Sequence, residues 1–186
     1  MTITREEATQ ALGEIDAAAG RAAEFKNYAH IAPFLILWGV VWMVCDLLIQ
    51  FEPRWGLTWP IGAGLGVLAS IVIGCGLPRD GVTAAERAMG WRHMASWMLV
   101  LVFIVALFQV IPITSPREVH SVFGLVFGFL YLGVGLWTGW RMAILGVALI
   151  VLTFVGFYAV GAWYALYMGL VSGGALILGG LWLRKI

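Results

Sequence analysis

Charged residues are what this sequence has least of. They make up 11% of the 186 residues, whereas hydrophobic residues make up 62%. A soluble domain is about 25% charged and about 45–50% apolar, so this chain lacks the polar surface that would cover a water-soluble globule. The formal net charge is +1, and no basic run is long enough to bind a nucleic acid. These shortages indicate that the lipid bilayer is the solvent of the chain.

Signatures of soluble enzymes and of secretion are also missing. The sequence has no Walker A, GxSxG, HExxH or CxxC motif, and no strand precedes Gly62, Gly64 and Gly66 to make them a dinucleotide loop. The first 29 residues carry eight charged side chains and no apolar core run, so they do not form a signal peptide. We therefore expect no enzyme, and the first hydrophobic helix should direct insertion itself.

Cysteine and histidine are scarce. Cys45 and Cys75 fall in hydrophobic segments near opposite membrane faces, so we expect small apolar fillers and no disulfide. His30 and His93 lie at the same depth, at the inner boundary of the membrane, and could be the two axial ligands of a haem iron. Histidines at a membrane interface are more often hydrated amphipathic side chains without such a role. Since none of the three histidines has the spacing of a ligand pair, we predict neither a cofactor nor a metal site.

Long apolar runs fill the rest of the chain. A helix needs about 20 apolar residues to cross the hydrocarbon core of a bilayer. Six segments meet this length, at residues 30–50, 58–77, 93–111, 120–140, 142–159 and 161–183. Most prolines lie between them, and Pro33 lies in the first turn of the first segment. We predict an all-α polytopic membrane protein, with a six-helix transmembrane domain over residues 29–186.

Basic residues predict the orientation of these helices. With a cytoplasmic N-terminus, nine of the 11 lysines and arginines face inward, and only Arg54 and Arg117 face outward. Tryptophans fall at both boundaries, as expected of an aromatic belt, and Trp59 is among those at the outer one. The chain should therefore lie in a bacterial-type inner membrane with both termini in the cytoplasm.

Residues 1–28 are predicted to form a separate cytoplasmic amphipathic helix. Thr4 and Glu7 match a capping box, and apolar residues then recur at helical spacing through Phe25. The apolar face is mostly alanine and the charges are mixed, which favours packing on protein over binding to anionic lipid. Residues 4–28 are expected either to pack on this chain or a second copy, or to bind a separate cytoplasmic protein.

Internal similarity suggests three helical hairpins. Each odd helix ends outside in a polar residue sixteen positions after an inner marker: Asp46 after His30, Gln109 after His93 and Tyr158 after Met142. Each even helix begins with a GxxxG pair: Gly62 and Gly66, Gly124 and Gly128, Gly169 and Gly173. Such pairs allow close helix packing, and parallel repeats are common in transporters. We expect the chain to form a homo-oligomer through these glycine faces. The alternative to a genuine repeat is that any membrane hairpins share glycine, tryptophan and inner arginine residues.

The rarest group in the membrane segments is the carboxylate of Asp46, about one turn inside the outer end of the first helix. Burying a charge in a membrane is costly, so such a residue normally faces a bundle interior or a watery cavity. Two interpretations are open. Asp46 binds a proton, cation or substrate, or it is a structural acceptor for Arg54, Arg117 or an indole N–H.

A polar stripe begins at His120, at the outer end of the fourth segment. Gly124, Tyr131, Gly135 and Thr138 lie within about 60° of it on a helix, as a narrow aqueous path or a packing surface would. If Asp46, Gln109 and His120 converge, they form an outer cluster that could sense pH, since histidine titrates near neutrality. The candidate pathway residues are Asp46, Gln109, His120, Tyr131, Thr138 and Tyr158.

One short run resembles a known family. Phe127-Gly128-Phe129-Leu130-Tyr131-Leu132 resembles a Phe-Gly-Phe-Thr-Tyr-Leu run of the acid-gated urea and amide channels, with Leu130 in place of threonine. That family also has six helices in repeated hairpins, although its termini lie outside. We expect a channel or transporter for a small solute or ion, with an outer site around Asp46. The alternative is a non-transporting regulatory or scaffold subunit that acts through the N-terminal helix.

Overall fold

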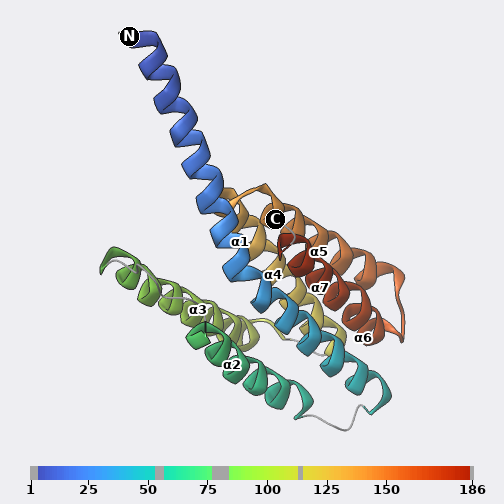
Figure 1. Ribbon diagram of the computed structural model, residues 1–186. Coiled ribbons are helices and arrows are strands. Elements are labelled where there is room, and N and C mark those ends of the chain that lie inside the picture. Colours follow the sequence, from blue (N-terminus) through green and yellow to red (C-terminus); the bar gives the residue numbers. More distant parts are fainter. Residues whose placement is uncertain (1–3, 53–56, 77–83, 113–114, 185–186) are drawn as a thin grey trace.

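Every regular element of the computed structural model is helical over the residues it describes, which are 4–52, 57–76, 84–112 and 115–184 (Figure 1). The elements are α1 (Arg5–Phe51), α2 (Thr58–Gly76), α3 (Ala84–Val110), α4 (Pro116–Thr138), α5 (Trp140–Ala159), α6 (Tyr164–Tyr167), the π-helix η1 (Met168–Gly173) and α7 (Gly174–Arg184). The last three follow one another without a break. The predicted all-α class is confirmed.

Five stretches of helix are long and apolar enough to cross a membrane: Phe25–Phe51, Thr58–Gly76, Pro116–Thr138, Trp140–Ala159 and Tyr164–Arg184. Their outward faces carry exposed leucine, valine, isoleucine and phenylalanine, which suit lipid tails. The chain is therefore an integral membrane protein whose partner is the bilayer. The apolar part of α3, Met98–Val110, is shorter than these five, so a sixth span stays a prediction.

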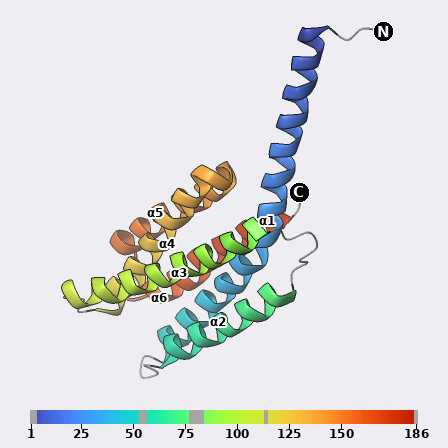
Figure 2. The same ribbon diagram turned by 90° about the vertical axis from the view of Figure 1, so that its left-hand side faces the viewer.

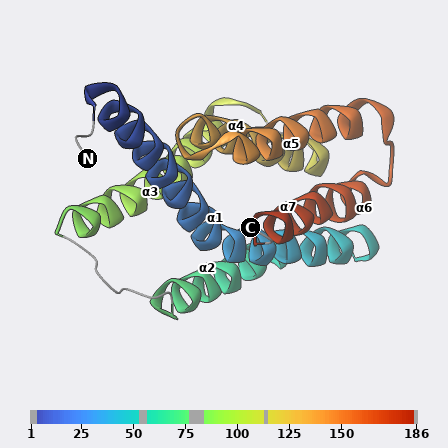
Figure 3. The ribbon, with the colours of Figure 1, turned by 45° about the horizontal axis from the view of Figure 1, so that its top comes forward.

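The packing of the helices divides them into two sets, one with the membrane part of α1 and one with α4 and α5. Helix α1 packs against α2, η1 and α7, and α4 packs closely along α5 (Figure 3). The contact of α3 with α4 includes the Phe108 and Phe123 rings, whose centroids are 5.7 Å apart. The closest helix pair is therefore α4 with α5, rather than the predicted hairpin of the third and fourth segments. Gly139, with φ 130°, makes the turn between α4 and α5.

Glycines allow these close approaches. A Cβ at Gly128 would lie 3.2 Å from the carbonyl oxygen of Gly146 on α5, and a Cβ at Gly173 would lie 2.9 Å from that of Gly39 on α1. Gly66 likewise faces the Trp38 ring of α1. All three predicted GxxxG pairs thus pack inside one chain. The prediction that these faces join copies into an oligomer is not supported, because they already have partners.

The N-terminal half of α1 projects away from the bundle (Figures 1 and 2). α1 continues unbroken through the predicted boundary at residue 28, and every side chain described between residues 4 and 27 is exposed. Leu12 is 62% exposed and Ile15 is 61% exposed, so packing of this segment on its own bundle is absent from the described structure. The predicted place of Pro33 in a first helical turn is wrong, because Pro33 lies in the interior of α1.

Candidate functional site

Asp46 and His120 form a buried pair where α1 and α4 meet. The Nε2 atom of His120 lies 2.8 Å from Oδ1 of Asp46. The Asp46 side chain is 0% exposed and that of His120 is 7% exposed, so neither reaches bulk water. Two candidate residues predicted from the sequence are thus in direct contact.

The start of α4 fixes the position of His120. Ser115 and Glu118 form a reciprocal capping box, and Pro116 occupies the first turn, where its missing N–H is harmless. The Nδ1 atom of His120 lies 2.6 Å from the carbonyl oxygen of Pro116. A carbonyl oxygen can only accept, so Nδ1 carries a hydrogen. Nε2 is then the atom that exchanges a proton with Asp46.

One further hydrogen must lie between Nε2 and Oδ1, because two lone pairs at that distance would repel. The pair is then either an imidazolium with a carboxylate, or an imidazole with a carboxylic acid. Both forms carry the same number of protons and no net charge. The pair thus avoids the cost of an isolated charge inside the membrane.

Trp59, in the first turn of α2, contributes a third polar group. Its Nε1 atom lies 3.2 Å from Oδ1 of Asp46 and 3.2 Å from Nε2 of His120. The Cys45 thiol donates to the Thr58 carbonyl at 3.8 Å, which holds the start of α2 against α1. Of the three donors considered for Asp46, the structure shows the indole N–H, that of Trp59, and Arg54 lies outside the described residues.

The second carboxylate oxygen of Asp46 has no such partner. Oδ2 is buried and has no hydrogen bond to any described residue. Gly169 of η1 packs against the Cβ of Asp46, where an added Cβ would come within 2.9 Å. A buried acceptor without a donor costs free energy, so Oδ2 is the part of the site that can bind a proton or a donor.

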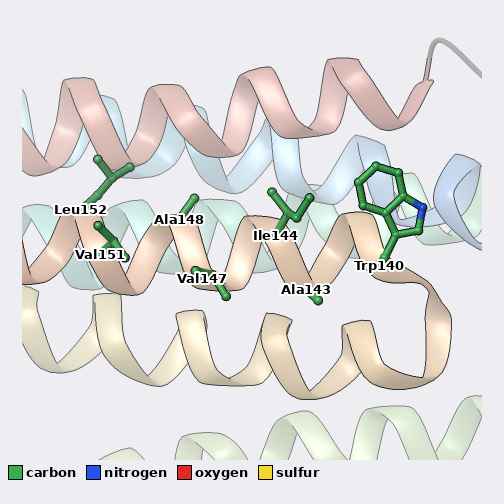
Figure 4. A pocket seen from close by; sticks show the side chains of 7 residues that line it. All are labelled: Trp140, Ala143, Ile144, Val147, Ala148, Val151 and Leu152. Carbon is green, nitrogen blue, oxygen red and sulfur yellow. The ribbon is translucent and has the colours of Figure 1, made fainter.

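A row of stacked aromatic rings begins at Trp59, next to the Asp46–His120 pair, and continues along α4 toward the middle of the membrane. Trp59 stacks on Phe123 with centroids 6.1 Å apart, and Phe123 stacks on Phe127 with centroids 6.4 Å apart. Tyr131 extends this stack along α4, 6.3 Å from Phe127. Two surface hollows are described, one along α5 (Figure 4) and one beside Arg5, and neither is lined by Asp46.

Polar groups around the pair hold the neighbouring helix ends. The Ser121 hydroxyl lies 2.6 Å from that of Tyr164, whose ring is 6.5 Å from the His120 ring. Arg117 donates to the carbonyl oxygens of Phe157 and, at 2.6 Å, Val160, so it caps α5 rather than pairing with Asp46. These contacts fix the position of the site but leave Oδ2 free of a partner among the described residues.

The other predicted pathway residues do not join the pair. Gln109 is exposed on α3, and Tyr158 is 79% exposed on α5. Thr138 donates to the backbone of Val134 at the opposite end of α4, and Tyr131 is half-buried in the aromatic stack. They therefore form no continuous polar path.

The sequence does not predict three of the residues in this site, which are Trp59, Ser121 and Tyr164. Trp59 was assigned to the interfacial belt, and Ser121 and Tyr164 had no signal at all, because a hydroxyl in an apolar run does not reveal its neighbours. The His30 ring contacts the backbone carbonyl of Lys26, and the side chain of His93 lies outside the described residues. No group of metal-ligating side chains occurs among the residues that the structure describes.

The fold and the site together define an α-helical integral membrane protein with a buried acid–histidine pair at one end of its bundle. No family model matches the chain, and comparison with curated proteins and with solved structures gives no match. At the level of residues, the likeness to the acid-gated channels therefore rests on the run Phe127–Leu132.

Proposed function

We propose that this protein is a channel or transporter for a small solute or ion in the inner membrane, with Asp46 and His120 as its proton-linked gate. The observation that carries the proposal is the sealed contact between Asp46 and His120, in which Oδ2 of Asp46 has no hydrogen bond from the part of the chain that the structure describes. Ionisable residues inside membrane segments commonly mark ion pathways and proton relays.

Gating follows from the proton count of the pair. A second proton, taken up on Oδ2, leaves a neutral carboxylic acid beside a cationic imidazolium. The attraction between opposite charges is then lost, only a hydrogen bond from Nε2 to Oδ1 remains, and the site without water carries a net positive charge. Separation of α4 from α1 would hydrate that charge and break the contact with Trp59. In this proposal the structure is the closed state, with the aromatic stack as the barrier.

Solute flux into proteoliposomes tests the proposal. We would follow urea, amides, glycerol and weak acids by stopped-flow light scattering at two pH values. Asp46→Asn is compared with wild type and with Glu52→Gln, which removes an exposed carboxylate near the same helix end. We expect selective, pH-dependent flux in wild type and Glu52→Gln, and flux without pH dependence in Asp46→Asn. Flat traces for every solute, from protein shown to be folded, would rule the proposal out.

A second candidate is a regulatory or scaffold subunit that acts through residues 4–28. The observation that favours it is the projecting half of α1, where every described side chain from residue 4 to residue 27 is exposed, including Leu12 and Ile15. Complementation of a strain that lacks the protein separates the two. A chain without residues 1–27 should fail and Asp46→Asn should succeed if the N-terminal helix is the working part. The reverse result supports transport.

A further inference from the structure

Arg141, in the first turn of α5, lies among aromatic rings at the end of the bundle opposite to Asp46. Its guanidinium carbon is 5.1 Å from the centroid of Trp182, 5.6 Å from Trp140 and 5.9 Å from Tyr28. Cation–π attraction of this kind holds an arginine in place without neutralising its charge. The rings therefore fix the cation and leave its charge available.

No acceptor among the described residues pairs with Arg141, and its Nη1 atom is buried without a hydrogen bond. Arg141 also lies at the N-terminus of α5, where Gly139 provides no side-chain cap. Helix N-termini attract anions, and arginine binds phosphate through a planar fork of N–H groups. This end of α5 thus has the chemistry of an anion site.

An apolar groove begins at the same place and runs along α5 (Figure 4). It has a volume of about 670 Å³, and its lining extends from Trp140 to Leu152 and carries only hydrocarbon side chains and one indole. Ala143 and Ala148 make it hollow by being smaller than their neighbours. At 1.5 Å per residue the lining is about 18 Å long, close to one leaflet of a hydrocarbon core of about 30 Å.

We propose that this groove binds an anionic phospholipid, with the phosphate on Arg141 and an acyl chain along α5. A cation at one end of a groove that is apolar and one leaflet long matches a single lipid in both charge and length. Trp140 belongs to both parts, since it lines the groove and contacts the guanidinium. The inference is independent of any transport activity.

Native mass spectrometry of the full chain in detergent measures this binding. Phosphatidylglycerol and phosphatidylcholine are added separately, and the fraction of protein with one bound lipid is followed by titration. Wild type should prefer phosphatidylglycerol. An interfacial basic residue contributes about 1 kcal/mol to attraction of an anionic lipid, so Arg141→Gln should weaken that binding about fivefold and spare phosphatidylcholine.

Ala148→Phe fills the groove without touching the cation and should weaken the binding of both lipids. Matched controls are Arg5→Gln, a distant exposed cation, and Val72→Phe, which adds a ring to an exposed position of α2. Neither control should change binding. Equal affinity for the two lipids in wild type, or unchanged phosphatidylglycerol binding in both test variants, would overturn the proposal. So would a lipid-free dimer that Ala148→Phe dissociates, which would give the groove to a second copy.

Discussion

At the scale of single residues, the two substitutions Asp46→Asn and Asp46→Ala should differ in cost. An asparagine keeps the shape of the side chain, and the group at the Oδ1 position can still serve one of the two neighbours. An amide oxygen there accepts from Trp59, or an NH₂ group there donates to Nε2 of a neutral His120. An alanine removes the carboxylate from His120 and Trp59 in a sealed site and leaves Nε2 of His120 only the indole N–H of Trp59 among its described contacts. Removing one member of a buried pair typically costs about 3–5 kcal/mol.

We therefore expect Asp46→Ala to lower the free energy of unfolding by about 3 kcal/mol and Asp46→Asn by about 1 kcal/mol. Unfolding of the purified protein in detergent measures both values. The double variant Asp46→Ala/His120→Ala should lose less unfolding free energy than the sum of the two single losses. The second substitution removes a side chain that has already lost its partner. Additive costs would mean that the two side chains do not interact.

Arg117 should stabilise α5 more than any surface cation does. It donates to the Phe157 and Val160 carbonyl oxygens, which lie at the end of a helix and have no helical donors of their own. Hydrogen bonds to a charged group contribute about 1.5–3 kcal/mol each. Arg117→Leu should lower the unfolding free energy by about 2 kcal/mol, whereas Arg5→Leu, at an exposed position, should leave it unchanged. Equal effects would show that the caps are dispensable.

At the scale of helices, two nearby glycines of α4 should respond in opposite ways to alanine. A Cβ at Gly135 would clash with the backbone of Ala143 on α5, whereas a Cβ at Gly133 would meet nothing within 4 Å. Forcing an extra methyl into a tight contact costs about 1–3 kcal/mol, and replacing an unpacked helical glycine gains up to about 1 kcal/mol. Thermal unfolding should rank Gly133→Ala at or above wild type and Gly135→Ala below it. The opposite order would refute the α4–α5 packing.

Helix positions could be predicted from the sequence, but helix neighbours could not. The predicted segments 30–50, 58–77, 120–140, 142–159 and 161–183 match the five spans within a few residues, because bilayer thickness sets their length. The pairing of helices depends on which apolar face of each helix contacts protein and which contacts lipid. Leucine occurs on both kinds of face, so the sequence does not distinguish them. The sequence therefore suggested a hairpin of the third and fourth segments, where the structure packs α4 on α5.

The same reasoning explains which site residues were found. Asp46 and His120 were conspicuous because ionisable groups are rare in apolar segments. Trp59 does not stand out in the same way, because tryptophan is common at membrane interfaces and therefore near helix ends. Spacing alone makes Gln109 and Tyr158 candidates, and the structure leaves both exposed. Spacing gives depth along a helix, whereas a shared site also needs the rotation of each helix about its axis.

At the scale of the whole molecule, the two cysteines offer a test of orientation. Both are free, with Cys45 buried on α1 and Cys75 exposed at the end of α2. A cytoplasmic N-terminus places the end of α2, after two crossings, on the cytoplasmic side. A membrane-impermeant maleimide should therefore label Cys75 in inside-out vesicles and spare it in intact right-side-out vesicles. Cys45 should react only after unfolding, and Cys75→Ser should abolish labelling of the folded protein.

The opposite labelling pattern would mean that the protein has the inverse orientation in the membrane. This would change which side of the membrane each proposed site faces. Arg141 and the start of its groove lie at the same end of the bundle as Tyr28 of α1, whereas Asp46 and His120 lie toward the other. A cytoplasmic Cys75 gives Arg141 access to the inner leaflet, and the Asp46–His120 pair then responds to external acid. An external Cys75 would expose Arg141 to the outer leaflet and make the pair a sensor of cytoplasmic pH. The labelling result thus decides from which side the pH should be changed in the flux experiment.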